Sequence, residues 1–318
     1  MKTESYKLDF FLQAAFTLQR TIRLLLVIAL LPSFLSLTSA KTKERTLIIK
    51  GAKPEKLAGD FKFTEGPACD SEGNIFFTDQ PNNRIMKWST DNKLSLFGEN
   101  FGRANGMYFD RKGNLVTCSD EKNELWSIAP DGKVTILIKD YEGKKLNGPN
   151  DLWIAPNGGI YLTDPFYKRS WWDHQASEQD GQHVYYLAPG ASKLIRVTND
   201  LEQPNGIIGT PDGKYLYVAD IKGNKTWRFS INKDGTLSEK KLFTDLGSDG
   251  MTIDIKGNIY LTGKGVSIFN PKGILIEKIP VDENWSANVC FGGKDRNLLF
   301  ITASKSVYGV KMKVKGCR

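Results

Sequence analysis

The stretch that decides the fold is Gly247-Ser-Asp-Gly-Met-Thr-Ile-Asp-Ile-Lys-Gly-Asn258, in which an acidic residue and a glycine precede an alternating apolar run. Such alternation is typical of a half-buried β-strand, and Lys-Gly-Asn is typical of a tight turn. The segment Asn258–Thr262 then predicts a second strand. The carboxylate of Asp249 therefore stands at the entrance to a partly buried strand, where a charge needs a physical explanation.

This pattern recurs six times along the chain, with starts that lie between 39 and 55 residues apart; the first residues of the copies are Glu65, Asn105, Asn150, Asn205, Asp249 and Asn288. A glycine follows eight positions later in five copies, and the sixth copy has Arg296 there. Each copy predicts two strands joined by a turn, and further strand-like runs such as Arg84–Trp88 and Lys133–Leu137 lie between copies.

Repeats of this length with about four strands each predict an all-β fold, a six-bladed β-propeller that spans residues 41–318 as a single domain. A closed ring of blades buries the sheet faces that an isolated four-stranded sheet would expose. The segment Thr46–Lys50 is the candidate for the strand that pairs with the last blade and closes the ring. A β-sandwich or two separate β-domains is the alternative.

Residues 1–40 predict an export signal, because basic residues precede the apolar run Leu24–Leu37 and the small residues Thr38-Ser-Ala40. Cleavage after Ala40 would leave no stable membrane insertion, and the alternative is an uncleaved anchor. Either way, the rest of the chain is expected outside the cytoplasm, in the periplasm or secreted.

The net charge of +8 is spread along the chain without a basic block, so nucleic-acid binding is not indicated. The four cysteines, Cys69, Cys118, Cys290 and Cys317, lack metal-ligand spacing. An oxidising compartment would permit disulfides, but the sequence does not choose among the three possible pairings.

The first residues of the six copies are expected to approach the central channel from equivalent positions and form a polar ring. The turn preference of Asn-Gly and Asp-Gly explains the residue types but neither their equivalent placement nor Glu65. Converging carboxylates and amide oxygens would repel one another unless a cation lay among them. Oxygen ligands suit Ca²⁺, with Mg²⁺, Mn²⁺ or Zn²⁺ as alternatives.

At these residues the chain resembles the gluconolactonase family, also called the regucalcin or senescence marker protein family. The resemblance covers about residues 46–310 and rests on a set of motifs in a fixed order: Glu65-Gly-Pro, Pro149-Asn-Asp-Leu152, Pro204-Asn-Gly206, Asp249-Gly-Met251, Phe291-Gly-Gly293 and Ile301-Thr-Ala303.

The resemblance implies a six-bladed propeller lactonase with one divalent cation in the channel, held by Glu65, Asn205 and Asp249. Asn150 matches the family asparagine that ligates the metal or contacts substrate, and Asn105 is a weaker candidate for lining the substrate site. Animal members carry an arginine where this chain has Gly148, which leaves the preferred lactone open.

The widest interval between copies contains Pro165–His174 and continues to His183. Its aromatic residues, Trp171 and Trp172 above all, are candidates for substrate binding as a lid or sugar-stacking wall. The equally favoured alternative is a surface excursion with two incidental tryptophans.

We therefore expect metal-dependent hydrolysis of a lactone, a small-molecule substrate and most plainly a sugar lactone, with Asp249 as both ligand and general base. No G-x-S-x-G motif supports a nucleophilic serine. Two alternatives stay open: a non-catalytic propeller that binds carbohydrate or a partner protein, and a related hydrolase of other cyclic esters or phosphotriesters.

Overall fold

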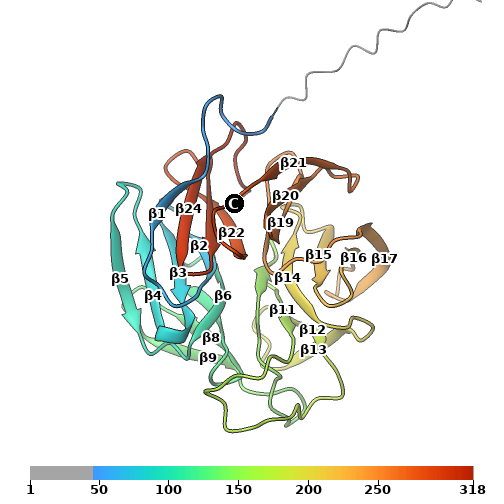
Figure 1. The fold of residues 1–318 in the computed structure, drawn as a ribbon. Helices are drawn as coiled ribbons and strands as arrows, with labels where there is room; N and C mark the ends of the chain where they lie inside the picture. Colours follow the sequence, from blue (N-terminus) through green and yellow to red (C-terminus); the bar gives the residue numbers. More distant parts are fainter. Residues whose placement is uncertain (1–45, 318) are drawn as a thin grey trace, which may run out of the picture. The chain divides into compact units, whose positions relative to one another are not determined.

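A computed structural model describes residues 46–317, and the predicted export signal lies outside these residues. The described part forms 24 β-strands and one short 3₁₀-helix, η1 (Gln80–Asn82), arranged as six four-stranded antiparallel sheets. Within residues 46–317 no helix is long and apolar enough to cross a membrane. The predicted all-β, six-bladed propeller is confirmed, and Figure 1 shows the blades around a common axis.

The strands of each blade are numbered in chain order from the axis outward. The first three blades consist of β2 (Thr64–Cys69), β3 (Ile75–Asp79), β4 (Arg84–Trp88) and β5 (Leu94–Glu99); β6 (Ala104–Phe109), β7 (Leu115–Ser119), β8 (Glu124–Ile128) and β9 (Val134–Ile138); and β10 (Leu152–Ile154), β11 (Ile160–Asp164), β12 (His183–Leu187) and β13 (Leu194–Thr198).

The remaining blades follow the same plan, except that the last one takes its outermost strand from the N-terminal side of the chain. They consist of β14 (Pro204–Gly209), β15 (Tyr215–Asp220), β16 (Lys225–Ile231) and β17 (Leu237–Thr244); β18 (Met251–Ile253), β19 (Ile259–Gly263), β20 (Gly265–Phe269) and β21 (Leu275–Ile279); and β22 (Ser286–Gly292), β23 (Leu298–Ala303), β24 (Ser306–Lys311) and β1 (Glu55–Ala58).

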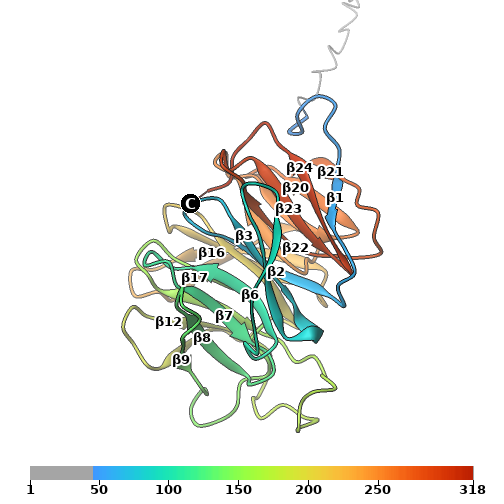
Figure 2. The same cartoon turned by 90° about the vertical axis from the view of Figure 1, so that its left-hand side faces the viewer.

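The ring closes where β1 pairs antiparallel with β24, which Figures 1 and 2 show as neighbouring strands from opposite ends of the described chain. The predicted pairing of Thr46–Lys50 with the last blade is present, with the Ile49 amide donating to the Lys311 carbonyl oxygen at 3.1 Å, but this segment is not the regular closing strand. That segment makes only an isolated bridge, between Ile48 and Met312, and the regular pairing begins at Glu55. Strand β24 is thus paired on both sides, with β23 and β1, and does not form the edge of its blade.

The turn glycines of the repeat adopt the left-handed backbone that the turn requires. Five of them have positive φ: Gly73, Gly113, Gly158, Gly213 and Gly257. Arg296, which replaces glycine in the sixth copy, is held in the same region at φ 58°. Its guanidinium donates to the carbonyl oxygens of Asp70 and Ser71 in the first blade, so this exception ties the last blade to the first.

Burial decreases from the axis outward. The second strands of the blades are almost entirely buried, as in β3 and β11, whereas the outermost strand β5 is largely exposed. The apolar core consists of clusters that lie between adjacent blades, where rings such as Phe77 and Phe300 meet at 5.5 Å between centroids. Inter-blade packing therefore fixes the innermost strands, and with them every side chain that faces the channel.

Candidate functional site

The residues of the predicted polar ring lie where the innermost strands begin. In β2, β6 and β14 the ladder is irregular at this point, because two residues face one residue of the next strand. Such β-bulges turn a side chain out of its regular direction. The bulged pairs are Gly66-Pro67, directly after Glu65, then Asn105-Gly106 and Asn205-Gly206, so the local backbone presents the polar residues to the axis.

Glycines beside the ring residues let adjacent blades approach closely. A Cβ atom on Gly66 would overlap the carbonyl oxygen of Asn105, and one on Gly250 would overlap the side chain of Asn288. The amide of Gly106 donates to the Asn150 carbonyl oxygen at 2.7 Å. The repeat-equivalent positions therefore converge in space as the sequence predicts.

Asp249 is held by donors on both carboxylate oxygens. Asn205 Nδ2 donates to Oδ1 at 2.8 Å, and Trp285 Nε1 donates to Oδ2 at 2.6 Å. Asn205 Nδ2 also lies 2.9 Å from the hydroxyl of Tyr167, which comes from the loop between β11 and β12. Both residues lie outside the repeated pattern; Tyr167 belongs to the aromatic stretch Pro165–His174 that the sequence marked as a candidate lid, whereas no sequence signal pointed to Trp285.

Asp151 is a third carboxylate in the ring, and the sequence analysis missed it. Its Oδ2 accepts a hydrogen bond from Asn288 Nδ2 at 3.3 Å, and these two residues belong to opposite blades, the third and the sixth. The pair thus spans the channel. A signal was present, because Asp151 stands where four of the other five copies have glycine: Gly66, Gly106, Gly206 and Gly250.

The three carboxyl groups share a negatively charged environment, in which Glu65 and Asp151 are buried and Asp249 is partly exposed. Burial, followed by the charges of Asp249 and Asp151 among its causes, raises the pKa of Glu65 well above its usual range. Burial likewise raises the pKa of Asp151 to about 7 and that of Asp249 to about 6. Folding therefore brings together negative charges that water would otherwise stabilise, and this arrangement favours a positive partner.

Two amide oxygens in the ring also indicate a positively charged partner, independently of the pKa values. Asn105 Oδ1 and Asn205 Oδ1 are buried and have no hydrogen-bond partner among the described residues. A buried acceptor without a donor is costly unless a cation satisfies it. No group of three His, Cys, Asp or Glu side chains in residues 46–317 is placed to hold a metal, so a cation here would need these asparagine oxygens. Carboxylate and amide oxygens together suit a hard divalent cation.

The loop of residues 165–182, drawn in yellow-green at the lower edge of Figure 1, contacts the ring through Tyr167. Trp172 is buried, stacks on His174 at 4.9 Å, and donates from Nε1 to the Asp120 carbonyl oxygen. Trp171 is partly exposed and donates from Nε1 to Asp120 Oδ1 at 2.9 Å. Substrate contact by the two tryptophans stays a prediction.

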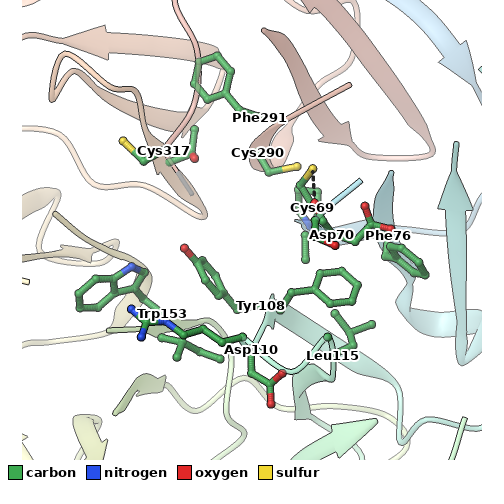
Figure 3. Close-up of a pocket in the computed structure, with 18 of the residues that line it drawn as sticks. Cys69, Asp70, Phe76, Tyr108, Asp110, Leu115, Trp153, Cys290, Phe291 and Cys317 are labelled. Atoms are coloured by element: carbon green, nitrogen blue, oxygen red, sulfur yellow. Dashed lines mark hydrogen bonds between the residues drawn. The ribbon is translucent and has the colours of Figure 1, made fainter. Parts of the chain in front are cut away.

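A large cavity of about 860 Å³ lies at the other end of the channel. It is lined by residues from the downstream ends of the innermost strands, including Tyr108, Trp153 and Phe291, and by none of the ring residues. Cys69, Cys290 and Cys317 face this cavity (Figure 3), and all four cysteines are free thiols. Burial raises the pKa of Cys69 to about 12, so this thiol is poorly reactive. Charged side chains such as Asp70, Asp110 and Arg296 also line this cavity, but the carboxyl groups of Glu65, Asp151 and Asp249 lie outside it.

Comparison with known proteins agrees with the resemblance noted in the sequence. The sequence profile of the SMP-30/Gluconolactonase/LRE-like region matches residues 63–305. A gluconolactonase of Zymomonas mobilis is 30% identical over 293 residues, which cover 82% of this chain and 82% of the relative. A diisopropyl-fluorophosphatase of Loligo vulgaris is 25% identical over 245 residues, covering 69% of this chain and 78% of the relative.

A solved structure has the same architecture over most of the chain. The gluconolactonase of Xanthomonas campestris superposes with a TM-score of 0.78 at 28% identity, covering 84% of this chain and 91% of that one.

Proposed function

Because the chain belongs to the SMP-30/gluconolactonase/LRE-like family, we propose that it is a lactone hydrolase, a carboxylic ester hydrolase whose first candidate substrate is a sugar lactone. The observation that supports the proposal most directly is the convergence of Glu65, Asn205 and Asp249 at one end of the channel, with buried amide oxygens that no donor within residues 46–317 satisfies. The relatives named gluconolactonase support the choice of substrate class.

The residues that would hold a divalent cation, Ca²⁺ first, are Glu65, Asn150, Asn205 and Asp249, with Asn105 beside them. When bound, such a cation supplies positive charge that polarises a carbonyl oxygen and makes a neighbouring water more acidic. The three ring carboxylates provide the compensating negative charge.

Asp249 is the candidate general base. At neutral pH its carboxyl is mostly ionised, and its raised pKa of about 6 makes it a better proton acceptor than an ordinary aspartate. The hydrogen bonds from Asn205 and Trp285 orient both oxygens, and the residue is partly exposed at the channel mouth where substrate would enter. Proton uptake at an Asp249 oxygen would accompany attack of water on the lactone carbonyl.

The test compares Asp249→Asn and Glu65→Gln with the parent in a panel of sugar lactones, with and without a chelator. Loss of the base is expected to lower kcat by about 10²- to 10⁴-fold, and loss of Glu65 to weaken Ca²⁺ binding measured by calorimetry. Asp91→Asn removes an exposed carboxylate far from the ring and serves as the control. Full activity in either ring variant would overturn the assignment.

A second candidate is hydrolysis of organophosphorus esters at the same residues. It is supported by the similarity to the diisopropyl-fluorophosphatase over more than two thirds of both chains. The ratio of kcat/KM for a sugar lactone to that for a fluorophosphate in one purified preparation separates the two. A ratio well below one would favour the second candidate.

A further inference from the structure

The 165–182 loop brings an arginine to the ring end of the channel. The guanidinium of Arg169 lies 5.1 Å from the centre of the Tyr167 ring, and the Tyr167 hydroxyl in turn contacts Asn205 at 2.9 Å. Burial raises the pKa of Asp249 and of Tyr167, and the positive charge of Arg169 offsets a part of each rise. Arg169 is therefore close enough to the proposed reacting groups for its field to reach them.

The guanidinium of Arg169 lies over the rings of Tyr167 and Trp171, at 5.1 and 5.5 Å from their centres, and is held by a hydrogen bond through one nitrogen. Nε donates to Asp120 Oδ2 at 3.0 Å, while neither terminal nitrogen has a hydrogen-bond partner among the described residues. Asp120 is itself buried and also accepts from Trp171 and Gln80. A well-held arginine that keeps a pair of parallel N–H donors free is suited to bind two adjacent oxygens of a ligand.

The same loop excludes a side chain from the position that Gly148 occupies. A Cβ atom on Gly148 would lie 2.7 Å from Cζ2 of Trp172, and φ at this glycine is +152°. Trp172 is held there by its hydrogen bond to the Asp120 carbonyl oxygen at 2.8 Å. Asp120 thus sets two features at once: Trp172 fills the space beside Gly148, and Arg169 is held with its donor pair free.

We propose that Arg169 is a substrate-positioning residue, whose two free terminal nitrogens bind adjacent oxygens of a polyhydroxylated lactone. This inference rests on the proposed lactone hydrolysis and adds a specificity determinant to it. A hydroxylated or acid-bearing lactone offers the oxygen pairs that a guanidinium recognises, whereas an unsubstituted lactone offers only its ester group. The chain should therefore favour sugar-type lactones over simple aliphatic ones.

The experiment measures kcat and KM of the parent and of Arg169→Gln on glucono-δ-lactone and on the unsubstituted δ-valerolactone, with Ca²⁺ present. The expected result is a loss of roughly 10- to 100-fold in kcat/KM on glucono-δ-lactone, mostly through KM, with δ-valerolactone unaffected. An equal loss on both lactones, or no loss on either, would overturn the proposal. Lys168→Gln removes a neighbouring exposed charge and is the matched control.

Arg169→Lys separates substrate binding from a role in holding the loop. Lysine can keep the ion pair with Asp120 but lacks the second, parallel donor, so the same selective loss is expected. Full activity of the lysine variant beside an impaired glutamine variant would show that Arg169 acts only through Asp120.

Calorimetric titration with gluconate, the open-chain acid, tests the contact between Arg169 and the ligand oxygens without turnover. The parent should bind at least about tenfold more tightly than either Arg169 variant, and equal binding would contradict the proposal. If the parent opens neither lactone while this difference in binding persists, the proposed function fails and the role of Arg169 in ligand binding stands.

Discussion

At the scale of single residues, Asp151 shows how one departure from a repeat changes the site. Glycine at this position in four other copies leaves room for the neighbouring blade, whereas Asp151 reaches across to Asn288 of the opposite blade. Its Oδ1 also accepts from the amide of Leu152 at 2.9 Å. Asp151 therefore accepts a hydrogen bond on each carboxylate oxygen, and its charge adds to burial and to Asp249 in raising the pKa of Glu65.

We predict that Asp151→Asn weakens Ca²⁺ binding by about tenfold, the lower end of what the loss of an outer partner costs a metal site. The variant removes negative charge close to Glu65 while nearly preserving side-chain volume. Isothermal titration with Ca²⁺ checks the prediction, with Asp91→Asn as a control for the same change in net charge. An unchanged dissociation constant would show that Asp151 does not contribute to cation binding.

At the scale of elements, the bulges at the start of the innermost strands have two effects. They turn the polar side chains toward the axis, and their glycines let the next blade approach. The regular strand that follows each bulge packs between neighbouring blades. A change at a bulge glycine should therefore affect stability and the site together.

We predict that Gly66→Ala lowers the free energy of unfolding by about 3 kcal/mol or more, because its Cβ would overlap backbone of the next blade and its φ is positive. Gly113→Ala is the matched control, since Gly113 also has positive φ but no atom lies within 4 Å of a Cβ there. The control should lose only about 1 kcal/mol. Guanidinium denaturation of both variants tests this, and equal losses would contradict it.

At the scale of the whole molecule, the closed ring brings carboxylates from three blades together at one end of the channel. Because the pKa values of Asp249, Asp151 and Glu65 are raised on folding, the folded chain binds protons more tightly than the unfolded chain between about pH 4 and 7. Their contribution to the stability of the metal-free chain therefore falls as pH rises through this window. A bound cation competes with those protons for the carboxylates. The stability that cation binding adds should therefore increase as pH rises.

We predict that the rise in Tm caused by saturating Ca²⁺ is larger at about pH 8 than at about pH 5. At a hundredfold excess over the dissociation constant, linkage gives about 2.7 kcal/mol of added stability, and protonation of the ring should remove most of it. Thermal unfolding with Ca²⁺ or with chelator at both pH values checks this. The same rise at both pH values would argue against a carboxylate-bound cation.

Much of this architecture follows from local patterns. The alternation of apolar residues and the recurring Asp/Asn/Gly turns predict the strand pairs, and the number of copies predicts the number of blades. The closing strand was predicted too early in the chain, because Thr46–Lys50 and Glu55–Ala58 are both short segments before the first copy. Which of the two pairs regularly with β24 depends on contacts between residues some 250 positions apart.

The sequence by itself determined the repeat, its ring of polar residues and the family, since these depend on residue type and spacing within each copy. The tertiary structure alone decided what reaches that ring from outside the repeat: Trp285 and Tyr167 beside Asp249 and Asn205, and Arg169 held by Asp120. The physical reason is that these contacts join separate blades and loops. Their distances are set by ring closure and inter-blade packing, and no local pattern encodes them.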